Sequence, residues 1–129
     1  MTKLVVMDAS AILALLLSEP GADKLTDEIM EASVISTVNL AEVQARLVRG
    51  GYEPNEAWED AMSLVKQVEP YSEQHARLAG DLILKTQNLG LSLGDRSCLA
   101  LALSLKAPVY TTEKSWKGLR LGIQVHCIR

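Results

Sequence analysis

The sequence has few aromatic residues: among its 129 residues there are two Trp, three Tyr and no Phe. This scarcity argues against base stacking on an open sheet as a main way of recognising nucleic acid. The 48% of hydrophobic residues therefore consists mostly of small aliphatic side chains, and with 22% charged residues it excludes a disordered chain. The composition predicts a helix-rich globular protein with an aliphatic core.

An excess of positive charge is also missing. The chain has 13 Lys and Arg against 16 Asp and Glu, a net charge of −3, and its pI is about 5.4. A protein that holds nucleic acid through a broad basic field is therefore excluded. Any chemistry on nucleic acid would need a local basic patch, a bound cation, or both.

Long apolar runs are absent as well. The run at residues 11–17 is far shorter than the roughly 20 residues that span a bilayer. Asp8 and Ser10 interrupt the apolar stretch, and no small-residue cleavage site follows, so a signal peptide is not expected. We therefore predict a cytoplasmic protein with no membrane partner.

Cysteine and histidine are scarce, with two residues of each type. Cys98 and Cys127 form no metal-binding spacing with His75 and His126. We expect buried structural thiols, and histidines that are structural or solvent-facing.

What the sequence does contain is an alternation of short β-branched runs with helical patterns. Asn39 is expected to cap one helix, and Pro70 restricts its strand to a sheet edge. The pattern predicts one α/β domain over residues 1–129, with three layers and a mostly parallel five-stranded sheet flanked by helices. The expected strands are residues 3–7, 34–36, 68–71, 108–110 and 123–128. The expected helices are residues 10–17, 22–32 and 40–49, one opening at Pro54, 73–88, one that has Asp95 in its first turn and ends at Leu105, and 115–119. The helix at 40–49 and the helix opening at Pro54 are expected to form a hairpin.

Four carboxylates follow a strand or open a helix. Asp8 follows the first strand, Glu42 lies early in the helix after the second, Asp95 opens a buried helix, and Glu113 follows the fourth strand. Ligands of open parallel sheets bind at the carboxyl ends of the strands, so these acids are expected to converge. Each also has an ordinary explanation, such as an N-cap or first-turn acid of a helix at Asp95, or an ion pair between Glu42 and Arg46.

Converging carboxylates repel each other by roughly 4 kcal/mol per pair at 4 Å and an effective dielectric constant of 20. A divalent cation would relieve that repulsion, and an all-oxygen site suits Mg²⁺, with Mn²⁺ as a substitute, rather than zinc. Such an ion can activate water for attack on a phosphodiester.

The sequence resembles those of the PIN-domain ribonucleases, and among them most closely those of the VapC-type toxins of toxin–antitoxin pairs. The likeness is carried, in order along the chain, by VVMDASAILALLLSEPG, ISTVNLAEVQARL, LSLGDRSCLALAL, and PVYTTEKSW followed by GIQVHCIR. The resemblance implies a PIN-like sheet in the order 3-2-1-4-5 and a metal site built from Asp8, Glu42 and Asp95. Ser10 matches the polar residue two positions after the first acid. Glu113 stands where the family usually has Asp, with Thr111 as its polar neighbour.

Basic residues near these acids are candidates for RNA binding. Arg46 and Arg49 share a helical face with Glu42, and Arg96 and Lys114 are further candidates. The leading hypothesis is a Mg²⁺-dependent endoribonuclease that cleaves RNA by metal-activated water. The resemblance further implies a homodimer and a cognate antitoxin protein that silences it.

Two other hypotheses remain open from the sequence. The substitution at Glu113 leaves room for a catalytically weak PIN scaffold that acts as a protein-binding module. Asp8 could also be a phospho-acceptor in a receiver-like or phosphatase-like domain, with Thr111 and Lys114 as imperfect partners.

Overall fold

The computed structural model describes residues 3–129. Within this range no helix combines the length and the apolar character that a membrane span requires. The strands are β1 (Val5–Met7), β2 (Ser33–Ser36), β3 (Gln67–Glu69), β4 (Val109–Thr111) and β5 (Val125–Cys127). The α-helices are α1 (Ala9–Leu16), α2 (Asp27–Glu31), α3 (Thr37–Arg49), α4 (Pro54–Leu64), α5 (Glu73–Lys85) and α6 (Leu93–Leu105). Three 3₁₀-helices complete the set: η1 (Ala22–Lys24), η2 (Gln87–Leu89) and η3 (Lys114–Gly118).

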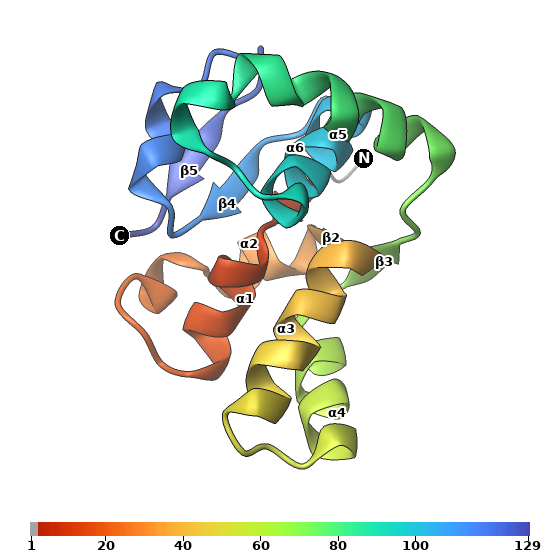
Figure 1. The fold of residues 1–129 in the computed structure, drawn as a ribbon. Coiled ribbons are helices and arrows are strands. Elements are labelled where there is room, and N and C mark those ends of the chain that lie inside the picture. The colour runs from red at the N-terminus through yellow and green to blue at the C-terminus, as the bar shows by residue number, and fades with distance from the viewer. Residues whose placement is uncertain (1–2) are drawn as a thin grey trace.

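The strands form one parallel sheet in the order β3-β2-β1-β4-β5 (Figure 1). Val6 of the central strand β1 lies opposite Val34 of β2 and Val109 of β4. The predicted strand order is confirmed, and so is the edge position of the third strand. This strand ends at Glu69, however, so Pro70 follows it and does not lie within it as predicted. Because all strands run the same way, their carboxyl ends meet at one edge of the sheet.

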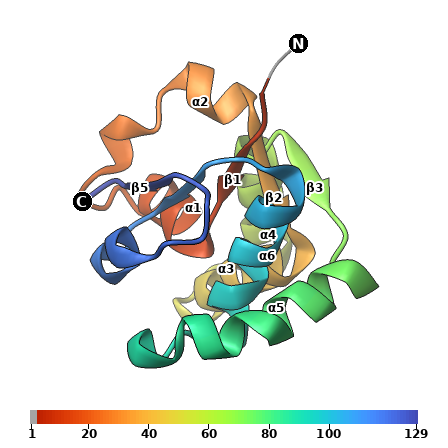
Figure 2. The same ribbon diagram turned by 90° about the horizontal axis from the view of Figure 1, so that it is seen from above.

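Helices cover both faces of the sheet, as the apolar strands require. Met7 and Ile35 pack on α1, α3 and α4, whereas their neighbours Val6 and Val34 pack in a second cluster with α5 and α6. The turned view shows α5 lying along α6, away from α1 (Figure 2). Both faces are thus filled with aliphatic side chains, and polar groups that follow β1 and β4 come out at the carboxyl edge.

The helices α3 and α4 form the predicted hairpin and extend side by side beyond the sheet (Figure 1). The chain turns between them at Gly51, whose φ of 101° lies in the left-handed region that suits glycine. Glu53 caps α4 by accepting hydrogen bonds from the Asn55 and Glu56 N–H groups at 3.0 and 2.9 Å. One arm of this hairpin, α3, carries side chains to the carboxyl edge of the sheet.

Several predicted helix bounds were wrong. The cap of α3 is Ser36, whose hydroxyl accepts from the Val38 N–H at 3.2 Å, so Asn39 lies inside the helix. The helix expected at 22–32 is divided into η1 and α2, because Thr26 caps a new helix through the Ile29 N–H. The helix expected at 73–88 ends at Lys85 and is followed by η2.

Candidate active site

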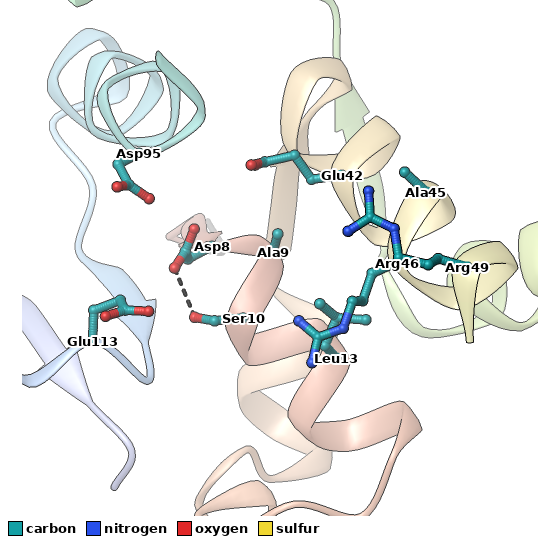
Figure 3. Close-up of a pocket in the computed structure, with 10 residues that line it drawn as sticks. All are labelled: Asp8, Ala9, Ser10, Leu13, Glu42, Ala45, Arg46, Arg49, Asp95 and Glu113. Carbon is teal, nitrogen blue, oxygen red and sulfur yellow. Dashed lines mark hydrogen bonds between the residues drawn. The ribbon is translucent and has the colours of Figure 1, made fainter. Parts of the chain in front are cut away.

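Four carboxylates from distant parts of the chain line one cleft at the carboxyl edge of the sheet. The cleft has a volume of about 350 Å³. Asp8 reaches it from the end of β1, Glu42 from α3, Asp95 from the first turn of α6, and Glu113 from the end of β4 (Figure 3). Ser10 of α1 also lines it. The fold therefore brings together the four acids whose positions in the sequence suggested convergence.

Asp8 is fixed by two hydroxyl groups. The Ser10 and Thr111 hydroxyls donate to its Oδ2 at 2.7 and 2.8 Å. The same hydroxyls accept hydrogen bonds from the N–H groups of Thr112 and Glu113, both at 3.0 Å. The end of β4 is thereby tied to the start of α1. Because both hydroxyls use Oδ2, the other carboxylate oxygen of Asp8 remains for a further ligand.

The environment of Asp8 opposes its charge. Its side chain is only 4% exposed, and burial raises its pKa from 3.8 to about 6. The two hydroxyl hydrogen bonds lower the pKa, and the charges of Asp95 and Glu42 raise it. The negative charges of Asp95 and Glu42 therefore repel that of Asp8 across the cleft, and a bound cation would reduce this repulsion.

Glu42 is held by a buried amide. The Asn39 Nδ2 donates to Glu42 Oε1 at 2.8 Å and to the Gly94 carbonyl at 3.0 Å. A side chain at Gly94 would collide with the Glu42 carboxylate, so only glycine lets Glu42 lie against the start of α6. The sequence reasoning missed both residues, although the Asn-x-x-Glu spacing on one helix face could have indicated the first.

Asp95 serves two purposes. It accepts the Ser92 N–H at 3.0 Å, and the Ser92 hydroxyl accepts the Asp95 N–H at 3.1 Å, which forms a capping box. Its side chain nevertheless lines the cleft. Asp95 is therefore a first-turn acid of α6 and not its N-cap, which is Ser92, and this role does not exclude a place in the site.

The predicted basic residues are not placed alike. Arg46 and Arg49 line the cleft, and within residues 3–129 neither forms an ion pair, so Glu42 is not neutralised by Arg46. Arg96 donates from Nη1 to the Ala79 carbonyl at 2.8 Å and does not line the cleft. Lys114 is exposed and directly follows Glu113 in the chain, but it does not line the cleft.

The histidines and cysteines lie outside the cleft lining. His75 is buried in the capping box of α5 and contacts the Ser104 hydroxyl at 3.2 Å. His126 is exposed and stacks on Tyr110 with ring centroids 4.7 Å apart. Both cysteines are free; Cys98 is buried, and burial raises its thiol pKa well above the ordinary value, while Cys127 is only partly buried.

The donor set of the cleft fits a hard divalent cation, since it consists of carboxylate and hydroxyl oxygens. Within residues 3–129, however, no three Asp, Glu, His or Cys side chains lie close enough together to hold an ion as they stand. Ion binding would therefore require the carboxylates to come closer together than they are in this structure.

Comparison with known proteins agrees with this arrangement. The family model described as PIN domain matches residues 5–120. The chain belongs to the PIN-domain family. This membership decides against the receiver-like interpretation of Asp8. No curated protein matches the sequence.

Solved structures share the PIN fold at low identity. DNA-bound VapBC from Salmonella typhimurium is 16% identical, with a TM-score of 0.75 over 98% of both chains. A toxin–antitoxin complex from Klebsiella pneumoniae is 19% identical, with a TM-score of 0.74 over 97% of this chain and 98% of that one. VapC20 of Mycobacterium tuberculosis, described as a sarcin-ricin loop cleaving toxin, is 17% identical, with a TM-score of 0.73 over 93% and 98%.

Proposed function

We propose that this PIN domain is a Mg²⁺-dependent endoribonuclease, the VapC-like toxin of a type II toxin–antitoxin pair in the cytoplasm. The observation that carries the proposal is the convergence of Asp8, Glu42, Asp95 and Glu113 on one cleft. Family membership and the toxin–antitoxin structures with the same fold support it.

In this proposal Asp8, Glu42 and Asp95 would hold the cation, and Glu113 would support it or a second ion. When bound, Mg²⁺ supplies Lewis acidity to the attacking water and to the phosphate. Ser10 and Thr111 orient Asp8 through their bonds to Oδ2. Neither His75 nor His126 is among the described residues that line the cleft, so no imidazole would serve as the general base.

The arginines of α3 supply the positive charge that the acids lack. Arg46 and Arg49 line the same cleft without an ion-pair partner among residues 3–129. They would bind phosphates of the RNA beside the scissile bond. Lys114, which follows Glu113 in the chain, would bind phosphate on the side of the cleft that Glu113 lines.

The test is cleavage of single-stranded RNA by the purified protein with Mg²⁺ or Mn²⁺. We expect Asp8→Asn and Asp95→Asn to reduce cleavage to background while circular dichroism shows an intact fold, and EDTA to stop the wild type. The control is Asp60→Asn, an exposed aspartate on α4 that does not line the cleft.

Full cleavage by Asp8→Asn, or cleavage that EDTA does not affect, would contradict the proposal. A folded wild type that binds no Mg²⁺ in calorimetry and turns over no RNA would indicate a protein-binding scaffold instead. The resemblance further predicts a homodimer, measured by light scattering, and an antitoxin that copurifies when both genes are expressed together.

A further inference from the structure

Positive charge is concentrated near the end of the chain. Residues 106–129 contain five Lys and Arg and a single Glu, a net charge of +4, although the whole chain carries −3. Lys114, Lys117 and Arg120 belong to this segment and are exposed. Within residues 3–129 none of the three forms an ion pair. Their charges are therefore available to a ligand.

The helix η3 holds two of these cations on one side. A 3₁₀-helix has three residues per turn, so the side chains of Lys114 and Lys117 lie one above the other. Trp116 lies between the two lysines in the sequence; it is only 1% exposed and packs into the core. The Trp116 N–H donates to the Glu113 carbonyl at 3.1 Å, and the Leu119 N–H donates to the Trp116 carbonyl at 3.0 Å. The backbone that carries the two lysines is thus held in place by the buried Trp116 and by these hydrogen bonds.

The segment leads from the acidic cleft to a second groove. At one end η3 directly follows Glu113, which lines the cleft. At the other end, Leu119 and Arg120 line a groove of about 470 Å³ together with Lys85 and Leu89. In Figures 1 and 2 this blue segment lies beside the teal end of α5 and η2. The groove is therefore lined by two cations and three leucines, the third being Leu121.

We propose that η3 and this groove form a track for the phosphates of single-stranded RNA, with Lys114, Lys117, Arg120 and Lys85 as its cations. The proposal rests on the proposed function, because the track begins at the cleft where cleavage would occur. Four carboxylates repel a polyanion, so RNA needs positive charge beside the cleft to approach it. Arg46 and Arg49 supply that charge on the α3 side, and the track supplies it on the β4 side.

The experiment measures binding without cleavage. Wild type in EDTA and the double variant Lys117→Gln/Arg120→Gln are titrated onto a fluorescent single-stranded RNA of about 20 nucleotides at several NaCl concentrations, because backbone contacts are salt-dependent. The control is Lys3→Gln/Lys66→Gln, which loses the same charge next to the amino ends of β1 and β3, at the opposite edge of the sheet.

We expect the track variant to bind RNA roughly tenfold more weakly near physiological salt, and its plot of log Kd against log salt to be shallower by about 1.4, or 0.7 per lost contact. The control should stay within about twofold of wild type, because its cations lie far from the track. If the two variants have equal affinity for RNA and equal salt dependence of log Kd, the proposal that the track binds RNA is wrong.

The result separates the two proposals. If wild type cleaves RNA with Mg²⁺ but the track variant binds it like the control, the track is wrong and the ribonuclease stands. If wild type cleaves no RNA, the binding titration in EDTA still decides whether the track holds single-stranded RNA. Because the track variant keeps Trp116 and the whole core, circular dichroism should show a wild-type fold.

Discussion

Asp8 is a charged residue in a place where burial disfavours charge. It is 4% exposed at the end of β1, and its pKa is raised to about 6 by burial. The Ser10 and Thr111 hydroxyls offset only part of the cost. An Asp at this position makes the metal-free fold less stable than an Asn would, which is typical of a functional residue.

We predict that Asp8→Asn stabilises the metal-free protein at neutral pH. The pKa of Asp8 is about 6 in the fold and 3.8 ordinarily, so its ionised form costs about 3 kcal/mol above pH 6, and this cost disappears below pH 4. Denaturant unfolding in EDTA should therefore show the variant more stable at pH 7.5, with the difference closing as the pH falls to 4. A constant difference across this range would contradict the burial of the charge.

Gly94 offers a second test at a single position. Gly94→Ala should push the Glu42 carboxylate away without unfolding the chain, because the colliding atoms belong to the end of a flexible side chain. Displacing a ligand in this way should reduce RNA cleavage by roughly 10- to 100-fold. The melting temperature should be unchanged or slightly higher, since Ala favours helices over Gly.

The matched control is Gly80→Ala in α5, where an added Cβ meets nothing within 4 Å. This variant should keep wild-type cleavage and gain stability of up to about 1 kcal/mol. If Gly94→Ala also cleaves RNA like wild type, the place of Glu42 against α6 has no importance for catalysis.

Among the helices, α3 and α6 contact each other and carry Glu42 and Asp95 to the cleft. Asn39 is 0% exposed and links the two helices by donating to Glu42 and to the Gly94 carbonyl. Its own oxygen, Oδ1, has no partner in the described chain. A buried amide with an unsatisfied oxygen is costly, so its position is better explained by holding Glu42 than by stability.

We therefore predict that Asn39→Leu weakens Mg²⁺ binding by roughly 10- to 100-fold, as the loss of a group that orients a metal ligand does. Calorimetry on the folded variant measures this. Gln44→Leu is the control, because Gln44 lies on the same helix and its amide donates to the Pro54 carbonyl at 2.9 Å, away from the cleft lining. Equal losses in both variants would mean that Asn39 acts through general stability alone.

For the molecule as a whole, charge is distributed unevenly. The cleft collects four acids, whereas residues 106–129 carry a net +4. This arrangement explains how a chain with net −3 could act on RNA: the acids are gathered where a cation would sit, and the bases lie on the flanks. The net charge alone argued against binding to nucleic acid, because it does not show that acidic and basic residues lie in different regions.

We predict that Mg²⁺ stabilises the whole fold, because it binds only the folded chain. At an ion concentration of about 100 times Kd, the free energy of unfolding should rise by about 2.7 kcal/mol. Thermal melts with Mg²⁺ and with EDTA measure this for wild type and for Asp8→Asn, in which the increase should be lost. An equal increase in both proteins would place the ion elsewhere.

Much of the fold could be predicted from the sequence. The alternation of apolar strands and helices predicted the parallel α/β sheet, because strands buried on both faces must be apolar throughout. The resemblance supplied the strand order. Helix bounds were less predictable, since Ser36 and Asn39 both make good caps. In the structure Ser36 is the cap, and the Asn39 amide instead binds Glu42 and, across the fold, the Gly94 carbonyl.

The sequence by itself determined which carboxylates are candidates, because position after a strand or at a helix start is a local property. The tertiary structure decided what surrounds them: Asn39 and Gly94 hold Glu42, Arg96 is directed to Ala79, and η3 connects the cleft to a basic groove. These contacts join residues far apart in the chain, or depend on which way a side chain points. Local patterning carries no information about such partners, so only the packed structure can assign them.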